Sequence, residues 1–168
     1  MSGIIGFNFE DRTLAQRMCD IMAHRGPDGE GYYINKNITL GHRRLSIIDL
    51  DQGSQPMTDH KGNWITFNGE IYNYIELRRE LGEANFFTSS DTEVILQAYR
   101  RWGKGCVNRL RGMFAFAIWD EEKQELFCAR DRFGIKPFYY TEVDGVLYFA
   151  SEVKALLPFS KCIETSLE

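Results

Sequence analysis

Residues that bind metals or form redox pairs are scarce in this sequence, which holds four cysteines and three histidines. No two cysteines stand at the short spacing of a zinc or redox motif. Each histidine is next to an Arg or Lys, whose positive charge disfavours a bound cation. These residues are Cys19, Cys106, Cys128, Cys162, His24, His42 and His60. We therefore predict reduced thiols and no metal site.

Long apolar runs and a strong charge of one sign are also missing. No segment approaches the ~20 apolar residues of a membrane-spanning helix, and the N-terminus lacks the basic and then apolar pattern of a secretory signal. The net charge is -4, and Lys and Arg are dispersed along the chain, which leaves no basic face for nucleic acid or anionic lipid. These absences predict a cytoplasmic protein with no nucleic-acid or membrane partner.

The sequence does contain enough apolar material for a core, with 43% hydrophobic and 14% aromatic residues. A chain of this length usually forms one domain. No repeat, low-complexity tract or linker divides it. We expect a single domain over residues 1–168.

Apolar periodicity predicts both strands and helices. Strands are expected over residues 4–9, 32–34, 38–45, 64–68, 112–119, 124–129, 137–140 and 146–150, the last four continuing as one antiparallel meander. Helices are expected over residues 12–23, 74–81, 92–102 and 152–156, the third capped by Asp91. Asn68-Gly69-Glu70 is expected to interrupt its strand. Residues 112–119 are apolar on both faces, which predicts a strand covered on both sides. This order predicts an α+β fold with two packed antiparallel sheets flanked by helices.

Seven short motifs go beyond fold class. They are MSGIIG (1–6), HRGPDG (24–29), GHRRLSIID (41–49), NGEIYN (68–73), SDTE (90–93), RDRFGIKP (130–137) and SEVKALL (151–157). In this order, they resemble the glutaminase half of glutamine-hydrolysing asparagine synthetases, from the first residue to Pro158. Amidotransferases that make glucosamine phosphate or phosphoribosylamine share fewer of them. The resemblance implies a four-layer αββα N-terminal-nucleophile fold.

Amide hydrolysis needs a nucleophile, a base, donors for the oxyanion and a clamp for the substrate. The resemblance assigns the nucleophile position to Ser2, where the family has a cysteine exposed by removal of Met1, with the free α-amine as base. A hydroxyl ionises far less than a thiol near neutral pH, so we expect strongly reduced activity. The sequence is compatible with a natural or an introduced serine.

The remaining site residues also follow from the resemblance. Asn68 and Gly69 would donate to the oxyanion, although an Asn-Gly pair more often marks a tight turn. The guanidinium of Arg44 would pair with the α-carboxylate of glutamine, beside backbone groups of Leu45, Ile47 and Ile48. Glu70 and Asp91 would hold the α-ammonium group. Residues 25–28 are expected to shape the pocket wall, and residues 130–137 to be structural or to face a synthetase domain.

The sequence has no phosphate-binding glycine loop, so we expect no cofactor in this domain. ATP and Mg are expected only in a synthetase domain, joined in cis or supplied as a separate subunit. The expected partners are that domain and L-glutamine, whose ammonia would pass to aspartate. Two alternatives stay open: another acceptor, such as a sugar or another carboxylate, and a non-catalytic glutamine-binding module.

Overall fold

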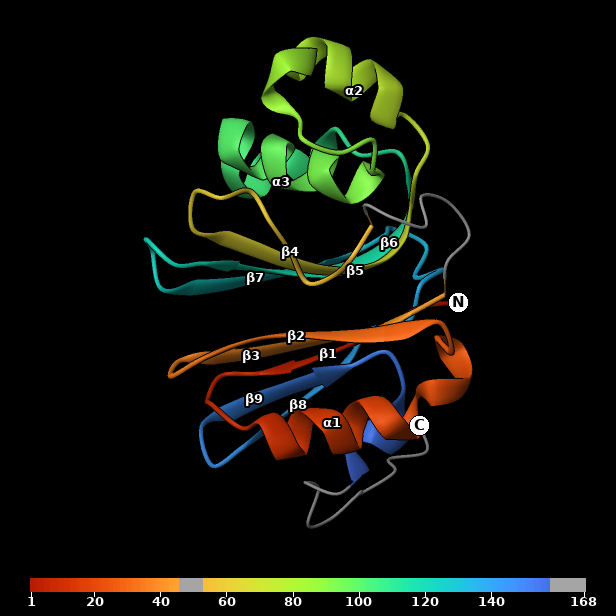
Figure 1. Cartoon of the computed structure of the whole chain (residues 1–168), viewed down its shortest axis with the longest axis vertical. Helices are drawn as coiled ribbons and strands as arrows, with labels where there is room; N and C mark the ends of the chain where they lie inside the picture. The colour runs from red at the N-terminus through yellow and green to blue at the C-terminus, as the bar shows by residue number, and fades with distance from the viewer. Residues whose placement is uncertain (46–52, 158–168) are drawn as a thin grey trace.

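The computed structural model describes residues 1–45 and 53–157. Two antiparallel sheets lie face to face, and helices cover their outer sides (Figure 1). The strands are β1 (Gly3–Phe7), β2 (Gly29–Asn35), β3 (Ile38–Arg44), β4 (Met57–Thr58), β5 (Asn63–Ile71), β6 (Gly112–Asp120), β7 (Glu125–Arg130), β8 (Tyr139–Val143) and β9 (Val146–Ala150). The α-helices are α1 (Arg12–Ile21), α2 (Tyr74–Leu81) and α3 (Asp91–Trp102).

The first sheet has the strand order β2-β3-β1-β9-β8, so the N-terminal strand β1 lies in its centre. Ile5 and Phe7 on β1 pack against Met18 of helix α1 on the outer face. The main chain of Ile4 is also bound to Ser151, whose hydroxyl accepts from Ile4 N–H and whose N–H donates to the Ile4 carbonyl, both over 2.9 Å. The beginning of the chain is therefore part of the core.

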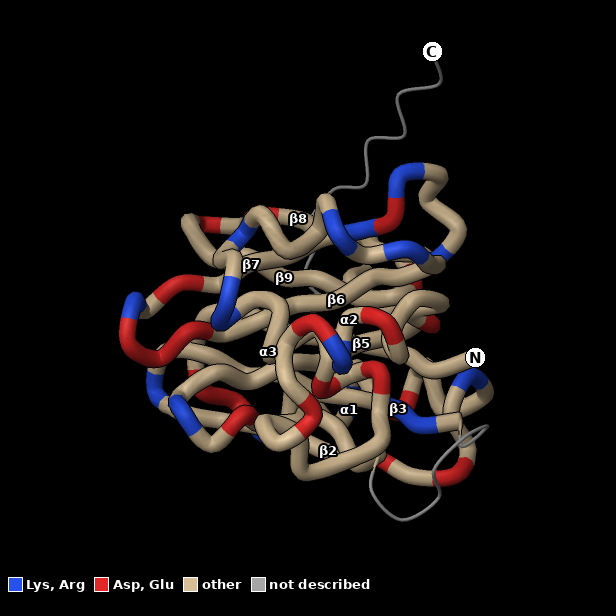
Figure 2. The backbone as a smooth tube through the Cα atoms, turned by 90° about the horizontal axis from the view of Figure 1, so that it is seen from above, with Lys and Arg blue, Asp and Glu red and all other residues tan. Residues whose placement is uncertain are grey.

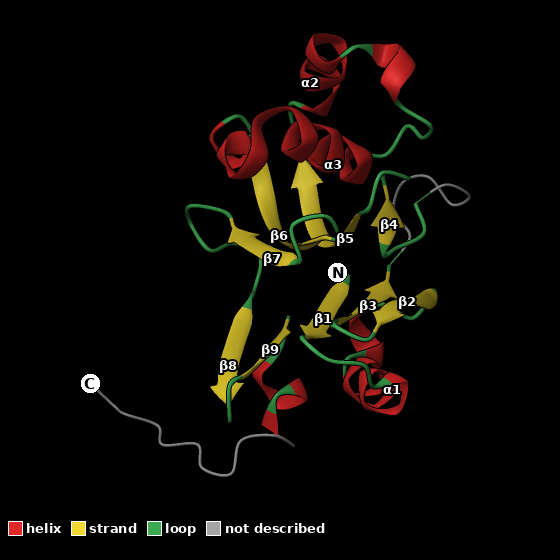
Figure 3. Cartoon of the chain, turned by 90° about the vertical axis from the view of Figure 1, so that its left-hand side faces the viewer, coloured by secondary structure: helices red, strands yellow, loops and turns green. Residues whose placement is uncertain are grey.

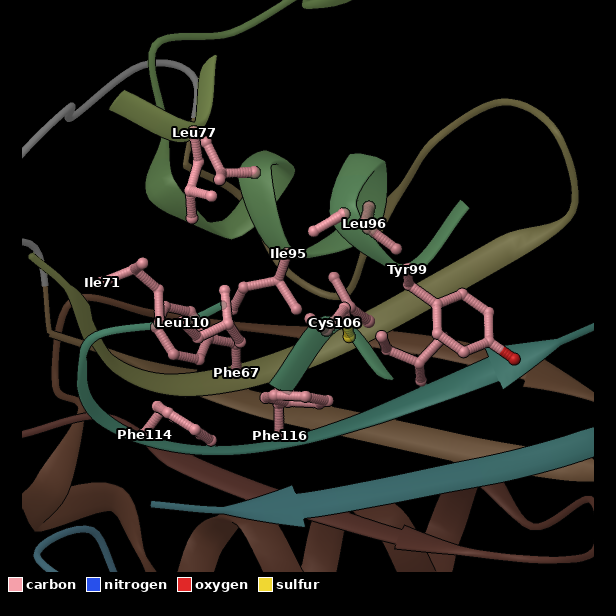
Figure 4. Packing of buried hydrophobic residues seen from close by; sticks show 14 of the residues in the cluster. Phe67, Ile71, Leu77, Ile95, Leu96, Tyr99, Cys106, Leu110, Phe114 and Phe116 are labelled. Carbon is pink, nitrogen blue, oxygen red and sulfur yellow. The ribbon is translucent and has the colours of Figure 1, made fainter. Parts of the chain in front are cut away.

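The second sheet has the order β4-β5-β6-β7, and α3 covers its outer face with α2 above it (Figures 1 and 4). Phe67, Phe114 and Phe116 of the sheet pack against Ile95 and Tyr99 of α3. Helix α3 presents an apolar stripe because its apolar residues recur at helical spacing. The predicted ranges of these two helices agree with the structure to within one residue.

Strand β6 separates two layers of core, as its apolar pattern predicts. Phe114, Phe116 and Ile118 face α3, whereas the small side chains of Ala115 and Ala117 and the large side chain of Trp119 face the first sheet. All six are buried. Because both sheets and both helix layers enclose apolar clusters, the predicted four-layer αββα fold is confirmed.

Strand β5 does not break at Asn68-Gly69-Glu70, so the predicted interruption is wrong. Its pairing with β6 continues through Gly69 opposite Phe114 and Glu70 opposite Met113. Gly69 has φ +156°, and a Cβ there would lie 2.1 Å from the Met113 carbonyl oxygen. The glycine is needed for this close approach of two strands, not for a turn.

The expected meander of four strands is divided between the two sheets. Strands β6 and β7 pair in the second sheet, and β8 and β9 pair in the first. Between them, the Asp131 carboxylate accepts from four backbone N–H groups, those of Phe114, Phe133, Ile135 and Lys136. This turn, organised around the buried Asp131, redirects the chain, and β8 starts at Tyr139 rather than at residue 137.

Two helix ends also differ from expectation. The first helix stops at Ile21 and is followed by a 3-10 turn over Ala23–Arg25, and the expected helix over residues 152–156 is a single 3-10 turn, Val153–Ala155. No helix in residues 1–45 and 53–157 is long and apolar enough to cross a membrane. Acidic and basic positions are interleaved around the backbone (Figure 2).

Candidate active site

Ser2 directly precedes β1 and is held by both its main chain and its hydroxyl. Arg25 Nε donates to the Ser2 carbonyl over 3.0 Å, and Leu45 N–H donates to Ser2 Oγ over 3.3 Å. Arg25 is in turn fixed by the Glu152 carboxylate at 3.3 Å. The N-terminus thus lies between the two sheets (Figures 1 and 3). Residues 25–28 were expected to shape the pocket wall, but none of them is among the pocket-lining residues of the described chain. Arg25 binds the main chain of Ser2 instead.

The part of β5 that β4 does not pair with lines the same pocket as Ser2. Strand β4 pairs only with Ile65 and Trp64. Beyond it, Phe67 N–H donates to Gln55 Oε1 over 2.6 Å, and Ile71 N–H donates to Asp91 Oδ2 over 2.9 Å. N–H groups two residues apart on a strand point to the same side. The N–H of Gly69, midway between these two, is therefore directed to this same open edge.

Asn68 points to the opposite face of β5 from Phe67, because side chains alternate along a strand. Phe67 packs under α3, so Asn68 faces the first sheet, where Ser2 lies. The Asn68 side chain is 3% exposed, and its Nδ2 has no hydrogen-bond partner among the described residues. A buried amide donor in this condition costs about 1–3 kcal/mol unless a ligand accepts from it. Asn68 is thus a donor available to a bound substrate.

A pocket of about 270 Å³ brings the candidate residues together. It is slightly smaller than the ~300–1,000 Å³ of most ligand sites, which suits a molecule the size of an amino acid. Seven predicted site residues line it: Ser2, Arg44, Leu45, Asn68, Gly69, Glu70 and Asp91. The other two, Ile47 and Ile48, lie outside the described residues.

Charges of both signs surround the pocket. Arg44 at the end of β3 and Lys136 in the turn after β7 supply the positive charges, and Glu70 on β5 and Asp91 on α3 supply the negative ones. Such a pair of opposed charges suits the carboxylate and ammonium groups of a zwitterion.

Asp91 is the first residue of α3 and not its N-cap, contrary to the prediction. Ser90 caps the helix, its hydroxyl accepting from Thr92 N–H over 3.1 Å. The Asp91 carboxylate is instead free to accept from Ile71 N–H. Burial, and then the charge of Glu70, raises the pKa of Asp91, while its backbone hydrogen bonds lower it.

Several further residues line the pocket without having been predicted as site residues, among them His42, Gln55 and Lys136. Gln55 stands in a segment of loop composition, and its role at Phe67 depends on the fold. Lys136 belongs to the RDRFGIKP motif, and the Asp131 turn buries it to 8% exposure. The position of Lys136 in this motif was the signal from which its place at the pocket could have been predicted. His42 Nε2 lies 3.1 Å from the Phe67 carbonyl oxygen.

The terminal amine lies in a cationic environment. Burial, and then the charges of Arg25 and Lys136, lowers the pKa of the Met1 amine, and Asp28 opposes this effect. This amine belongs to Met1, whereas the expected base is the nitrogen of residue 2, which is an amide as long as Met1 is present. Among residues 1–45 and 53–157, no group of three or more metal-ligating side chains was found.

A solved structure of an amidotransferase is similar in fold to this chain. The solved structure of glutamine phosphoribosylpyrophosphate amidotransferase from Bacillus subtilis has a TM-score of 0.77 to this chain. The match covers 92% of this chain and 42% of that one, at 22% sequence identity. Similarity at this level shows that the two proteins share the fold.

Sequence comparison specifies the family. The family model described as "Glutamine amidotransferase domain" matches residues 1–167, and the chain belongs to this family. It is 48% identical over 162 residues to asparagine synthetase [glutamine-hydrolyzing] 1 of Bacillus subtilis (strain 168), covering 95% of this chain and 26% of that protein. It is 45% identical over 159 residues to asparagine synthetase B [glutamine-hydrolyzing] of Escherichia coli (strain K12), covering 92% and 28%. The chain spans about a quarter of the length of these relatives.

Proposed function

We propose that this chain is the glutaminase unit of an asparagine-synthetase-type amidotransferase, which hydrolyses L-glutamine to L-glutamate and ammonia. The observation that carries the proposal is the meeting of three groups at one pocket. Ser2 lies beside the first sheet, and β5 carries both the Gly69 N–H and the Asn68 Nδ2, which has no hydrogen-bond partner in the described part of the chain. These are a nucleophile and two oxyanion donors.

In the proposed reaction, the residue 2 side chain attacks the carboxamide carbon of glutamine. The free α-amine of residue 2, present once Met1 is removed, takes the proton of the nucleophile and passes it to the leaving nitrogen, which departs as ammonia. Asn68 and Gly69 stabilise the negative oxygen of the tetrahedral intermediate. Water then hydrolyses the acyl-enzyme to glutamate, with the amine again acting as base.

Charged side chains of the pocket recognise the amino-acid part of the substrate. The Arg44 guanidinium binds the α-carboxylate, next to the backbone of Leu45, Ile47 and Ile48. Glu70 and Asp91 bind the α-ammonium group. The opposite charges of these residues at one pocket support this assignment. It orients the carboxamide toward Ser2.

The acceptor of the ammonia lies in the part of the relatives that this chain does not span. Identity of 45–48% to proteins named asparagine synthetase favours aspartate, activated with ATP and Mg in a synthetase domain in cis or on a separate subunit. A sugar or another carboxylate is the alternative acceptor. This domain itself needs no cofactor, because every step of the hydrolysis is assigned to its own groups and water.

Ser2 sets the rate in this proposal. A serine hydroxyl has a much higher pKa than a thiol, and the terminal amine is a modest base, so little of the nucleophile ionises. We expect glutamine binding with very slow hydrolysis. A retained Met1 would slow the reaction further, because it acylates the amine that acts as base.

The test compares this chain with its Ser2→Cys variant for release of glutamate from L-glutamine. Mass spectrometry on both proteins establishes whether Met1 is removed. The cysteine variant with a free terminus should release glutamate at least about 100-fold faster than the serine chain, whereas both should bind glutamine with similar affinity. If the cysteine variant with a free terminus neither binds nor hydrolyses glutamine, the proposed function is wrong. If both bind and neither hydrolyses, the chain is a glutamine-binding module.

A further inference from the structure

Two buried hydrogen bonds cross from the first sheet to the second beside the pocket. Thr66 Oγ1 donates to the Gly41 carbonyl over 3.0 Å, and His42 Nε2 lies 3.1 Å from the Phe67 carbonyl oxygen. A carbonyl oxygen can only accept, so His42 Nε2 must carry the hydrogen. Burial lowers the pKa of His42 to about 4, and the ring is therefore neutral at pH 7 with Nδ1 unprotonated.

The Phe67 carbonyl is an unusual place for a side-chain hydrogen bond, because it belongs to a strand. Phe67 lies beyond the end of β4, whose pairing stops at Ile65. Two side chains bind the backbone groups of Phe67 that β4 does not reach. Gln55 Oε1 accepts from the Phe67 N–H, and His42 donates to the Phe67 carbonyl. The carbonyl is one half of the peptide group that joins Phe67 to Asn68. Binding it fixes the plane of that peptide.

The backbone of His42 lies beside β1, the strand that Ser2 directly precedes. In the pairing of β1 with β3, Ile4 lies opposite His42 and Gly3 lies opposite Arg43. Ser2 follows immediately beyond this ladder. His42 therefore joins two parts of the site that come from different sheets, the end of β1 and the Asn68-Gly69 segment of β5.

We propose that His42 is a positioning residue of the glutaminase site, holding the Phe67–Asn68 peptide so that the oxyanion donors Asn68 and Gly69 stand at a fixed distance from the nucleophile. This inference rests on the proposed function. His42 is among the residues that line the pocket, but this role does not depend on a contact with the substrate. It acts through the backbone of β5.

A matched pair of variants isolates the Nε2 hydrogen bond. In His42→Gln, the amide nitrogen reaches about as far as Nε2 and can donate to the Phe67 carbonyl; in His42→Asn, the amide nitrogen stops near the position of Nδ1 and cannot. Both are made in the Ser2→Cys chain with a free terminus. We expect His42→Asn to lower kcat by about 10- to 100-fold, less than the ~10²–10³ of losing a donor outright, with KM changed less than about threefold. His42→Gln should recover most of kcat.

Thr66→Val is the control for a purely structural effect. It removes the other crossing hydrogen bond, which binds Gly41 and not the peptide before Asn68. It should lower the melting temperature about as much as His42→Asn does, because both variants lose one buried hydrogen bond. Its kcat should stay within about threefold of the parent, since the oxyanion donors keep their anchor.

A measurement without any substitution covers the case in which His42→Asn does not fold. Nitrogen-15 NMR of the ring distinguishes the two neutral tautomers and the cation. The expected result near pH 7 is a neutral ring with hydrogen on Nε2. Hydrogen on Nδ1 alone would remove the donor to Phe67 and overturn the inference.

The outcomes separate the inference from the function on which it rests. If the Ser2→Cys chain releases no glutamate, the proposed function fails. If that chain is active and the two His42 variants and Thr66→Val all have the same kcat, the positioning role is wrong and the function stands. A loss in His42→Asn that His42→Gln does not recover also overturns the role of the Nε2 hydrogen bond.

Discussion

Asn68 is a residue whose contribution to stability and proposed contribution to catalysis have opposite signs. Its Nδ2 is buried without a partner among the described residues, which is unfavourable for folding. The same donor is favourable when a negative oxygen forms beside it. A site that stabilises a transition state commonly carries such a group.

Asn68→Ala, made in the active Ser2→Cys chain, separates the two contributions. We expect kcat to fall by about 10²–10³-fold, because one oxyanion donor is lost. The free energy of unfolding should stay within about 1 kcal/mol of the parent or rise, because no protein hydrogen bond of Nδ2 is removed. Steady-state kinetics and urea unfolding measure the two quantities.

Asn63→Ala on the same strand is the matched control. Asn63 is also buried, but its Nδ2 donates to Asp59 Oδ2 over 2.7 Å. Its removal should cost about 1–3 kcal/mol of stability and leave kcat unchanged. An Asn68→Ala variant with parental kcat would remove Asn68 from the oxyanion site.

At the scale of the element, β5 has one edge that is fully paired and one that is mostly unpaired and lies at the pocket. Along one side it pairs with β6 through nine residue pairs, from Asn63 opposite Asp120 to Ile71 opposite Gly112. Along the other it pairs with β4 only at Ile65 and Trp64. Because β4 stops after two residues, a short stretch of the β5 backbone is open to the pocket while its other edge stays paired with β6.

Gly69→Ala tests how tightly this strand is held. A Cβ at residue 69 would lie 2.1 Å from the Met113 carbonyl oxygen and 2.7 Å from Phe114 Cα, both on β6. We expect a loss of about 3 kcal/mol or more, since backbone atoms on the paired strand have to shift. Gly105→Ala, where a Cβ meets nothing within 4 Å, should change stability by less than about 1 kcal/mol. Equal melting temperatures for the two variants would contradict the close approach.

Strand β5 also separates what the sequence alone predicts from what depends on the fold. Apolar periodicity predicted most strands and helices, because alternation and helical spacing are local properties of the chain. The Asn68-Gly69 pair was misjudged as a break because its requirement for glycine comes from Met113, which is 44 residues away in the sequence. The roles of Gln55 and Lys136 depend in the same way on elements that only the fold brings near.

At the scale of the whole molecule, the two sheets meet across a mostly apolar layer that contains one imidazole. Burial, and then the charge of Arg44, lowers the pKa of His42 from 6.5 to about 4, although the Phe67 carbonyl opposes the shift. Below pH 6.5, the unfolded chain binds a proton that the folded chain does not. Stability contributed by the neutral ring is therefore complete above that pH and is lost as the pH falls toward about 4.

His42 alone should lower the free energy of unfolding by about 2 kcal/mol between pH 7.5 and pH 5. Urea unfolding of the parent and of His42→Gln at these two pH values measures this contribution, because glutamine does not titrate. The variant should lose less stability than the parent by about this amount. Parallel losses in the two proteins would show that His42 takes up its proton equally well in the folded chain.

The central position of β1 has a consequence for the kinetics of folding. Its neighbours in the first sheet are β3 and β9, and Ile4 is bound through both its N–H and its carbonyl by Ser151, 147 residues away in the sequence. Contacts of such large sequence separation cost loop-closure entropy before they stabilise the chain, and they form slowly. We therefore expect the pairing of β1 with β9 to be a late event in the folding of the first sheet.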